Sequence, residues 1–384
     1  MQSRRFIRPR LTDFRKENWS TKIQMKVLYI VRTFSPVGGM ERYVYETALA
    51  MASKGHSVGV LCRSLGEASS PPVGVDTTLL SLPRVKRGWQ DRAFFAGATA
   101  DVLSHTDITR RYDIIHSHEN TWGQHVSTEH GPCTKAGLRR SPWKVFDYSA
   151  LRNLLLEKSK FRAPPLVGVA FCSLQVECEI LREYPPLGNI VRSVIPPAFA
   201  YFSAFPKTKA RRKTIGFIGA DWKRKGLLKA LDVFRAIKLK DDSWTMVVAG
   251  VEAADLPDLI LSRLNDGVSV IGRVEAVDFF SQIDVLLHPA REEPFGMVIA
   301  EALSLGIPVV VSGRCGCLSH LDAEGISMVD LRESSVVWAE RCLEFSGKRA
   351  HLRSLRSWSD VAADHESLYE QILSSQSTAL ASRS

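Results

Sequence analysis

Short apolar runs alternate with longer amphipathic stretches along most of the chain. The first run, KVLYIV at residues 26–31, leads into a loop with two glycines and then into a helical pattern that ends near Gly55. Further strand-like runs lie at residues 57–62, 112–118, 122–131, 165–173 and 191–199. Apolar runs of this kind predict strands that are buried on both faces, and their alternation with helices is typical of parallel α/β layers.

The pattern starts again after residue 200. Residues 201–213, YFSAFPKTKARRK, are polar, basic and interrupted by Pro206, which is typical of a linker. A second series of strand-like runs begins at residue 214 and ends with IPVVVSG at residues 307–313. Two α/β units predict two domains that face each other across a cleft, because ligands of parallel sheets bind at the carboxyl ends of the strands.

We therefore divide the 384 residues into four parts: a basic arm at 1–24, an N-terminal domain at 25–200, a C-terminal domain at 201–357, and an amphipathic helix with a tail at 358–384. The arm lacks the apolar core of a secretory signal. No apolar run reaches the ~20 residues that a membrane-spanning helix needs. The seven scattered cysteines, an odd number, indicate reduced thiols and a cytoplasmic location.

The formal net charge of +10 raises the question of an anionic partner. Nucleic-acid binding is one interpretation. However, the basic residues are dispersed, and the sequence contains no helix-turn-helix or zinc-finger pattern. Attraction to an anionic membrane surface or to a phosphate-bearing substrate fits the charge as well.

Residues 291–313, REEPFGMVIAEALSLGIPVVVSG, place a helix start directly after a Pro-Phe-Gly turn. The helix is predicted to begin between Phe295 and Met297, and Gly296 allows a ligand to approach the backbone closely. The first N–H groups of a helix lack partners within the helix, and together with the helix dipole they favour an anion.

Two carboxylates flank this helix start. Glu301 lies one turn after Met297, and Glu293 lies on the preceding loop. Carboxylates accept hydrogen bonds from hydroxyl groups, so the arrangement predicts a pocket for a sugar nucleotide. The alternative is an ordinary loop glutamate beside a helical glutamate that is favoured by the dipole.

Two further strand–loop–helix units carry candidate ligand contacts. Arg224 and Lys225 are predicted in the first turn of a helix, where the helix dipole makes positive charge unfavourable. A bound diphosphate would offset this cost, and the alternative is a solvated basic turn. Gly38 and Gly39 open the helix after the first strand without forming a dinucleotide fingerprint. They allow close approach of a ligand, although a flexible turn explains them equally well.

A histidine-rich segment follows at residues 116–131. A metal site is possible in principle, but the spacing of its histidines matches no zinc signature. His130 ends a predicted strand beside Gly131, where ligand contacts tend to occur, and Glu119 is a second candidate at a strand end.

Together these motifs resemble glycosyltransferase family 4, the retaining enzymes of the GT-B fold. The resemblance rests on the E-x7-E motif in EPFGMVIAE and on VLYIVRTFSPVGGMERYV, STEHG, VIPPAF and IDVLLHPA. It implies two Rossmann-like domains that face each other across a cleft. The helix at residues 358–373 resembles the family's crossover helix, which returns to the N-terminal domain. The motif GADWKRKGL is similar to that of lipopolysaccharide core glucosyltransferases, which use UDP-glucose.

The resemblance also implies roles for single residues. His130 would lie at the reaction centre near the 6-hydroxyl of the donor sugar, and Arg224 and Lys225 would bind the diphosphate. Glu293 would hold hydroxyls of the donor sugar, and Glu301 would hold the ribose. The remaining substrate-binding groups would be the loop of Gly38 and Gly39 and the amides of Phe295, Gly296 and Met297. Ala220 stands where many members have an arginine, which leaves phosphate binding to Arg224 and Lys225.

The function expected from this resemblance is transfer of a hexose from UDP-glucose or a similar nucleotide sugar to a lipopolysaccharide core or another cell-envelope glycan. No metal or other cofactor and no nucleic acid is expected. The acceptor would bind basic loops of the N-terminal domain, at Arg84, Lys86, Arg87 and residues 135–140, near Trp89, Trp122 and Trp143, with the protein peripheral on the inner face of the cytoplasmic membrane. The alternatives are a soluble transferase with a small acceptor and a catalytically silent GT-B scaffold that binds a nucleotide.

Overall fold

The computed structural model describes residues 24–68, 70–83, 85, 88–105, 107–199, 213–264 and 266–381. The predicted arm lies outside these residues except for Gln24, and the predicted linker lies outside them except for Lys213. The boundary placed between residues 200 and 201 therefore stays a prediction.

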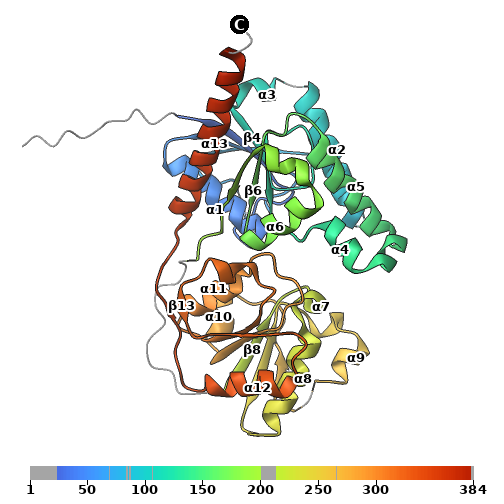
Figure 1. Cartoon of the computed structure of the whole chain (residues 1–384), viewed down its shortest axis with the longest axis vertical. Helices are drawn as coiled ribbons and strands as arrows, with labels where there is room; N and C mark the ends of the chain where they lie inside the picture. Colours follow the sequence, from blue (N-terminus) through green and yellow to red (C-terminus); the bar gives the residue numbers. More distant parts are fainter. Residues whose placement is uncertain are drawn as a thin grey trace, which may run out of the picture.

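The N-terminal domain contains a parallel sheet with helices on both faces (Figure 1). In spatial order, its described strands are β3 (Val75–Leu79), β2 (Ser57–Cys62), β1 (Lys26–Ile30), β4 (Ile114–Ser117), β5 (Val126–Glu129), β6 (Gly168–Phe171) and β7 (Val191–Val194). The helices are α1 (Met40–Ser53), α2 (Gly88–His105), α3 (Ile108–Arg111), α4 (Thr134–Arg140), α5 (Tyr148–Arg162) and α6 (Leu174–Glu183), with 3₁₀ turns η1 (Pro142–Phe146) and η2 (Pro185–Asn189).

The C-terminal domain repeats this architecture. In spatial order, the described strands of its parallel sheet are β10 (Val268–Val270), β9 (Thr245–Ala249), β8 (Thr214–Ile218), β11 (Val285–His288), β12 (Val309–Ser312) and β14 (Ile326–Val329). The helices are α7 (Trp222–Lys225), α8 (Leu227–Lys238), α9 (Asp258–Leu261), α10 (Ala276–Phe280), α11 (Met297–Ser304) and α12 (Ser335–Glu344), with 3₁₀ turns η3 (Ala253–Asp255) and η4 (Gly316–Ser319). A small antiparallel pair joins β13 (Ala323–Glu324) to β15 (His351–Leu352).

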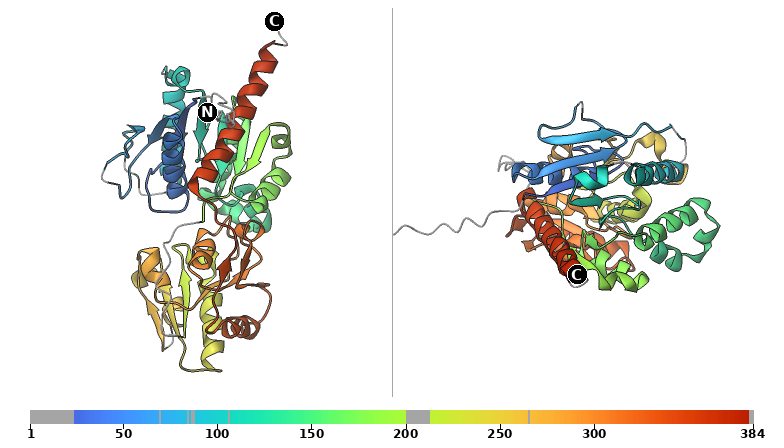
Figure 2. Two further views of the ribbon diagram at one scale, coloured as in Figure 1. Left: turned by 90° about the vertical axis from the view of Figure 1, so that its left-hand side faces the viewer. Right: turned by 90° about the horizontal axis from the view of Figure 1, so that it is seen from above.

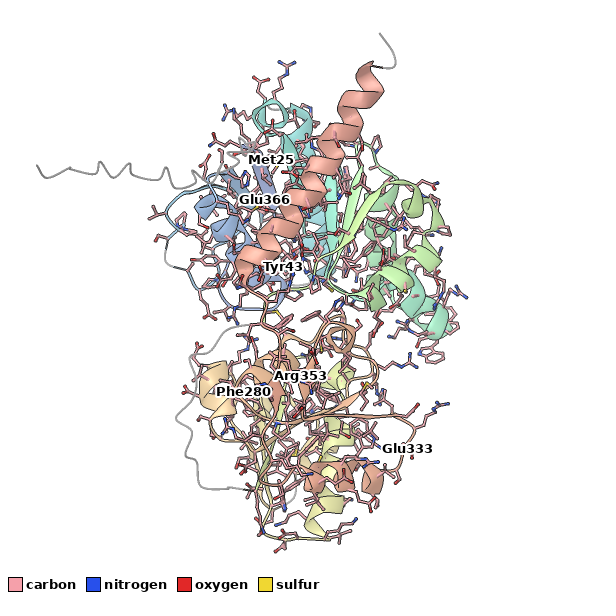
Figure 3. All side chains as sticks on the ribbon, turned by 60° about the vertical axis from the view of Figure 1, so that its left-hand side comes forward. Met25, Tyr43, Phe280, Glu333, Arg353 and Glu366 are labelled. Carbon is pink, nitrogen blue, oxygen red and sulfur yellow. The ribbon has the colours of Figure 1, made fainter. Side chains whose placement is uncertain are left out.

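The last helix, α13 (Trp358–Ala381), returns to the N-terminal domain, as the sequence predicted. Figure 2 shows it running along that domain, and Figure 3 shows Glu366 of α13 in the same half of the molecule as Met25 and Tyr43. Glu366 accepts hydrogen bonds from Lys54 and His56, both at 2.7 Å. The apolar side of α13, which includes Val361, Leu368 and Ile372, belongs to the same hydrophobic core as β1 and α1.

A separate hydrophobic core lies between the two domains. It joins Phe171 and Val176 of the N-terminal domain to Phe295 and Ile299 of the C-terminal domain. Burial of this apolar surface holds the carboxyl ends of the two sheets against each other. The predicted GT-B arrangement of two Rossmann-like domains is therefore confirmed. Among the described helices, none has both the length and the apolarity needed to cross a bilayer.

Candidate active site

The candidate residues lie where strands of the two facing sheets end. β11 ends at His288, and the loop that follows carries Glu293 into the start of α11. β8 leads through Gly219 into α7, which carries Arg224 and Lys225. In the other domain, β5 ends one residue before His130. Parallel sheets bind ligands at this edge.

The start of α11 has the geometry that the sequence predicted. Gly296 precedes the helix in the left-handed conformation, at φ +96°. A Cβ there would lie 3.0 Å from the side chains of both Glu293 and Ile299, so glycine fits best. Among the hydrogen bonds of the described loops and caps, none uses the N–H of Phe295, Gly296 or Met297. These amides are therefore able to receive an anion.

Glu293 is buried and surrounded by hydrogen-bond donors. Its Oε2 lies 3.1 Å from Lys225 Nζ and 3.2 Å from His288 Nε2, and its Oε1 lies 3.6 Å from Arg224 Nη1. Burial alone would raise the pKa of this carboxyl group, but the hydrogen bond with His288 and the charges of Lys225 and Arg224 outweigh burial and lower it. Glu293 is therefore an anion and a hydrogen-bond acceptor.

The structure corrects the predicted position of Arg224 and Lys225. They do not begin the long helix; they end a separate turn, α7, and Gly226 at φ +84° separates this turn from α8. Asp221 caps α7 by accepting the N–H of Arg224 at 3.2 Å. The two cations therefore lie just before the N-cap of α8 and not within its first turn, so the predicted position was wrong.

Glycines let the Lys225 side chain reach the site. A Cβ on Gly219 would lie 2.1 Å from Cδ of Lys225, and a Cβ on Gly226 would lie 2.2 Å from the carbonyl oxygen of Pro289. Side chains at either position would therefore displace Lys225 or the loop after β11.

Glu301 faces the N-terminal domain, where it forms an ion pair with Arg42. The distance from Arg42 Nη1 to Glu301 Oε1 is 3.1 Å, and the Glu301 side chain is 9% exposed. Burial raises the pKa of Glu301, and Arg42 opposes that shift. Arg42 lies in the first turn of α1, three residues after the N-cap Gly39, and Gly38 precedes that cap at φ +112°. The predicted glycine loop therefore lies close in sequence to the residue that contacts Glu301.

His130 belongs to a stack of imidazole rings. Its Nε2 lies 2.8 Å from Nδ1 of His118, and the ring of His118 stacks on that of His116 with 4.5 Å between centroids. Burial lowers the pKa of His130 to about 3, with a further contribution from Lys160. His130 is therefore neutral in its folded environment at neutral pH.

The stack continues to the crossover helix. His116 Nδ1 lies 2.6 Å from the hydroxyl of Tyr369, and His365 Nε2 lies 3.0 Å from the hydroxyl of Tyr43. His125 lies apart and accepts the N–H of Ile115 at 3.2 Å. Within the described part of the chain, no histidine, cysteine or acidic residues group in a way that could hold a metal ion.

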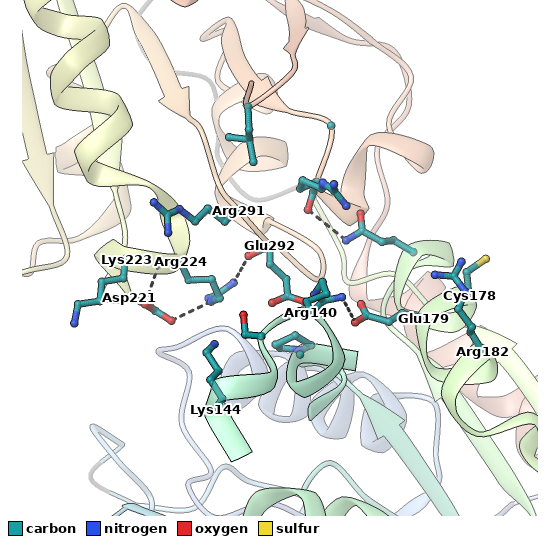
Figure 4. A pocket seen from close by; sticks show the side chains of 17 residues that line it. Arg140, Lys144, Cys178, Glu179, Arg182, Asp221, Lys223, Arg224, Arg291 and Glu292 are labelled. Atoms are coloured by element: carbon teal, nitrogen blue, oxygen red, sulfur yellow. Dashed lines mark hydrogen bonds and ion pairs between the residues drawn. The ribbon is translucent and has the colours of Figure 1, made fainter. Parts of the chain in front are cut away.

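A cavity of about 930 Å³ opens between the two domains beside Arg224 (Figure 4). Its N-terminal wall comes from α4, η1 and α6, and its C-terminal wall comes from α7 and the loops around Glu292 and Gly313. Arg140 joins the two walls, because it pairs with Glu179 at 2.7 Å and also with Glu292. Arg224 Nη1 donates to the carbonyl oxygen of Glu292 at 2.8 Å.

Several predictions about the acceptor region need correction or stay open. Residues 135–140 form part of helix α4 and not a loop. Of the three tryptophans, Trp143 is exposed, whereas Trp89 and Trp122 are partly buried. Arg84, Lys86 and Arg87 lie outside the described residues.

The sequence analysis missed Arg42 and His288 as members of the site, and it named Arg140 only as one of the basic residues 135–140 of the acceptor region. Arg42 comes three residues after the glycine pair, and His288 ends the strand before the E-x7-E motif. Their closeness to these motifs could have identified both as site residues. The pairing of Arg140 with Glu179 and Glu292 had no signal, because these partners are distant in the sequence.

Two family models match most of this architecture. The model described as "Glycosyltransferase Family 4" matches residues 37–163, and the model described as "Glycosyl transferases group 1" matches residues 212–345. The curated relatives include a D-inositol 3-phosphate glycosyltransferase of Mycolicibacterium smegmatis, 26% identical, with 76% of this chain and 74% of that protein covered. They also include the lipopolysaccharide glucosyltransferase WaaG of Escherichia coli, 20% identical, with 77% of this chain and 83% of that protein covered.

Solved structures show the same fold. The crystal structure of WaaG, a glycosyltransferase involved in lipopolysaccharide biosynthesis, matches with a TM-score of 0.70 at 16% identity and covers 90% of this chain and 98% of its own. Anabaena HepE in complex with UDP-glucose matches with a TM-score of 0.58 at 15% identity and covers 92% of this chain and 100% of its own. The chain therefore belongs to glycosyltransferase family 4 and is a retaining glycosyltransferase of the GT-B fold that uses a nucleotide sugar.

Proposed function

We propose that this enzyme transfers a hexose from UDP-glucose or a similar UDP-sugar to a lipopolysaccharide core or another cell-envelope glycan. The observation that carries the donor site is the buried, ionised Glu293 beside Lys225, Arg224 and the start of α11. Similarity to WaaG and to the UDP-glucose complex of HepE supports the choice of donor and acceptor.

The cations and amides suit the departure of a diphosphate. As the bond to the anomeric carbon breaks, positive charge develops on the sugar and negative charge on the leaving phosphate. Arg224, Lys225 and the amides of Phe295 to Met297 would bind that negative charge without rearranging during the reaction, which lowers the barrier. Lys225 would then be shared between the diphosphate and Glu293.

The carboxylates would position the donor. Glu293, as a permanent acceptor, would hold hydroxyls of the sugar, and Glu301 would hold the ribose hydroxyls in exchange for part of its contact with Arg42. In a front-face reaction the leaving phosphate accepts the proton of the acceptor hydroxyl, so no protein base is required. The neutral His130 would orient the donor by a hydrogen bond from the N-terminal side.

Release of UDP from UDP-glucose tests this function. With purified protein, we expect slow release alone and faster release when lipopolysaccharide core is added. A panel of UDP- and GDP-sugars, screened by the shift in melting temperature, identifies the donor. If no nucleotide sugar stabilises the protein, the proposed donor site is wrong; if UDP-glucose binds but no glycan accelerates release, the proposed acceptor is wrong.

A small soluble acceptor is the second candidate. The Mycolicibacterium relative is a D-inositol 3-phosphate glycosyltransferase, and it is more similar in sequence to this chain than WaaG is. Under this alternative, UDP release would respond to soluble sugar or polyol phosphates and not to lipopolysaccharide core. The same assay therefore separates the two candidates.

An exposed aromatic patch supports a membrane-held acceptor. Phe146 is 90% exposed and Trp143 is 69% exposed, and both belong to η1. Lys144 lies between them, and Arg139 and Arg152 lie on the adjoining helices. Aromatic side chains surrounded by cations suit the headgroup region of an anionic bilayer.

Sedimentation with vesicles tests this docking. We expect binding to vesicles that contain phosphatidylglycerol, release in a salt series, and loss of binding in W143S/F146S. The matched control is Leu239→Ser, which replaces an apolar side chain that is 85% exposed in the C-terminal domain. Equal vesicle binding by W143S/F146S and the wild type would exclude this patch.

A further inference from the structure

The imidazole ring of His118 has one nitrogen in a hydrogen bond and one without a partner. Its Nδ1 lies 2.8 Å from Nε2 of His130. Its Nε2 is buried, and no group in the described part of the chain forms a hydrogen bond with it. The rings of His116, Tyr29 and Tyr43 pack around His118, with centroids 4.5, 5.6 and 5.8 Å away. These surroundings restrict where the hydrogen of a neutral His118 ring can lie.

The bond between His118 and His130 can be formed in two ways. Burial lowers the pKa of both residues, so each ring is neutral and carries one hydrogen on one of its two nitrogens. If His130 donated, the hydrogen of His118 would lie on Nε2, and a buried N–H would lack an acceptor. If His118 donates through Nδ1, its Nε2 is a bare nitrogen with no hydrogen to place. Buried N–H groups without an acceptor are rarer than buried acceptors without a donor, which favours the second arrangement.

Two other buried histidines show the same preference. Burial lowers the pKa of His288, and its Nε2 lies 3.2 Å from the carboxylate of Glu293, which can only accept. The hydroxyl of Tyr43 donates to the carbonyl oxygen of Ile195 at 3.2 Å, so it accepts from Nε2 of His365 at 3.0 Å. In both rings the remaining nitrogen, Nδ1, is buried without a partner in the described chain. In both cases, therefore, the nitrogen without a partner is the bare one.

Donation by His118 fixes the hydrogen of His130. Because Nε2 of His130 accepts, its own hydrogen must lie on Nδ1. This nitrogen forms no hydrogen bond with the described residues, and it does not belong to the buried atoms without a partner, so it keeps contact with solvent. His130 follows β5 at the carboxyl edge of the sheet. The group that His130 offers to a ligand is therefore an N–H, which donates a hydrogen bond and cannot take up a proton.

We propose that His118 is a positioning residue that holds His130 in the tautomer whose Nδ1–H donates to an oxygen of the donor sugar. This inference rests on the proposed function and adds a residue and a chemical role to it. His130 would orient the sugar and would not act as a general base towards the acceptor hydroxyl. A donor that is fixed before the ligand binds loses less freedom on binding than one that exchanges between tautomers.

Heteronuclear NMR of the free, full-length protein with isotope-labelled histidine tests the tautomer directly. Imidazole nitrogens with and without a hydrogen differ clearly in chemical shift, and His130→Ala identifies the signals of His130. We expect the hydrogen of His130 on Nδ1 in the wild type at neutral pH. A hydrogen on Nε2 would overturn the inference. This measurement requires no substitution of His118, so it decides the question even if such variants do not fold.

Variants of His118 test whether this residue sets the tautomer. His118→Phe removes the hydrogen-bond donor, whereas His118→Asn keeps an N–H group close to the position of Nδ1. We expect His130 to exchange between both tautomers in H118F and to keep its hydrogen on Nδ1 in H118N. The control is His365→Phe, which removes another buried ring of the stack but no hydrogen bond to His130. An unchanged tautomer in H118F, or an equal change in H365F, would contradict the proposal.

Calorimetry with UDP-glucose and with UDP measures the consequence for binding. Because His130 would contact the sugar, H118F should weaken binding of UDP-glucose by up to about tenfold, the effect of one hydrogen bond, and leave the affinity for UDP unchanged. In the H130A background, H118F should have no further effect, because His118 acts only through His130. Equal losses for both ligands, or additive losses in H118F/H130A, would mean that His118 has only a structural role.

Failure of this inference can be told from failure of the proposed function, because the tautomer is measured without a ligand. If the wild type binds neither UDP-glucose nor another nucleotide sugar, the proposed function is wrong, and the role of His118 in it is wrong as well. If UDP-glucose binds but the hydrogen of His130 lies on Nε2, the role of His118 alone is wrong.

Discussion

At the scale of single residues, the charge of Glu293 depends on the balance between its burial and its cationic and hydrogen-bonding neighbours. A carboxyl group buried as deeply as this one would ordinarily favour its neutral form. Here three neighbours, His288, Lys225 and Arg224, reverse that preference and lower its pKa. The site therefore holds one anion and two cations in contact before any ligand binds. A diphosphate would bind to cations that are already in position.

Replacement of Lys225 by alanine tests that balance. We expect turnover with UDP-glucose to fall by ~10²–10³-fold, the range found when one preorganised donor to a developing negative charge is lost. The fold should survive, because α7 is a short surface turn. The measurements are kcat and the melting temperature. The control is Lys229→Ala on α8, whose ammonium donates to the exposed backbone carbonyl of Glu333. Normal turnover in K225A would refute the assignment.

A second residue-scale prediction concerns Arg42. Its removal leaves Glu301 buried without this cation, so we expect R42A to lose about 1–3 kcal/mol of unfolding free energy, less than a fully buried pair because Arg42 is 22% exposed. Adding E301Q should recover most of the loss, since a neutral amide needs no counter-charge. Urea unfolding of both single variants and the double variant measures the coupling. Strictly additive losses would mean that the two side chains do not interact.

At the scale of secondary-structure elements, the histidine stack links β4, β5 and α13. His116 and His118 come from β4 and the residue after it, His130 follows β5, and His365 belongs to α13. Burial lowers the pKa of each of these four histidines. The stack therefore connects the crossover helix to His130 through contacts between buried rings.

These lowered pKa values predict acid sensitivity. A histidine whose pKa is lower in the folded than in the unfolded state binds more protons when unfolded, so stability falls as the pH decreases. The affected interval runs from about 6.5, the ordinary pKa, down to about 3, the folded value for His130 and His365. Each such histidine contributes about 1.4 kcal/mol per pH unit within the interval.

Urea unfolding over a pH series across that interval measures the slope. His118→Gln removes one of the buried rings and should reduce the slope by up to the contribution of one proton. The control is His105→Gln, because the His105 side chain is 74% exposed. An identical slope in H118Q and the wild type would show that another group accounts for the acid sensitivity.

At the scale of the whole molecule, the two domains are held together by side chains that meet only across the cleft. Ser173, which caps α6, donates to the carbonyl oxygen of Pro294 at 2.7 Å. Gly316 packs into the same contact, where a Cβ would lie 2.0 Å from that carbonyl oxygen and 2.4 Å from Ser173 Oγ. A side chain at Gly316 would therefore disturb both the Pro294 loop within its own domain and the contact with Ser173 across the cleft.

Gly316→Ala should push the domains apart. We expect a larger radius of gyration in small-angle scattering and weaker donor binding, because Glu301 and Arg42 would separate. The matched control is Gly313→Ala in the same loop, where a Cβ would meet nothing within 4 Å. A wild-type scattering profile for G316A would show that the loop adjusts locally instead.

Much of this site could be predicted because its motifs are local. Glu293, the turn at Gly296 and Glu301 lie within one loop and one helix, so their spacing fixes their relation. The division of residues 222–238 into α7 and α8 was missed, since both halves have helical sequences and only Gly226 separates them. The edge strand β3 was missed because most of its side chains are exposed, which leaves little apolar pattern.

The sequence alone determined the two series of buried strands and the start of α11, because buried parallel strands and helix caps depend on neighbouring residues. Tertiary structure alone decided which distant groups meet: Arg42 with Glu301, Arg140 with Glu292, and His116 with Tyr369. Each pair joins residues that are more than a hundred positions apart. Their contact follows from how whole domains and α13 pack, and no local pattern records that packing.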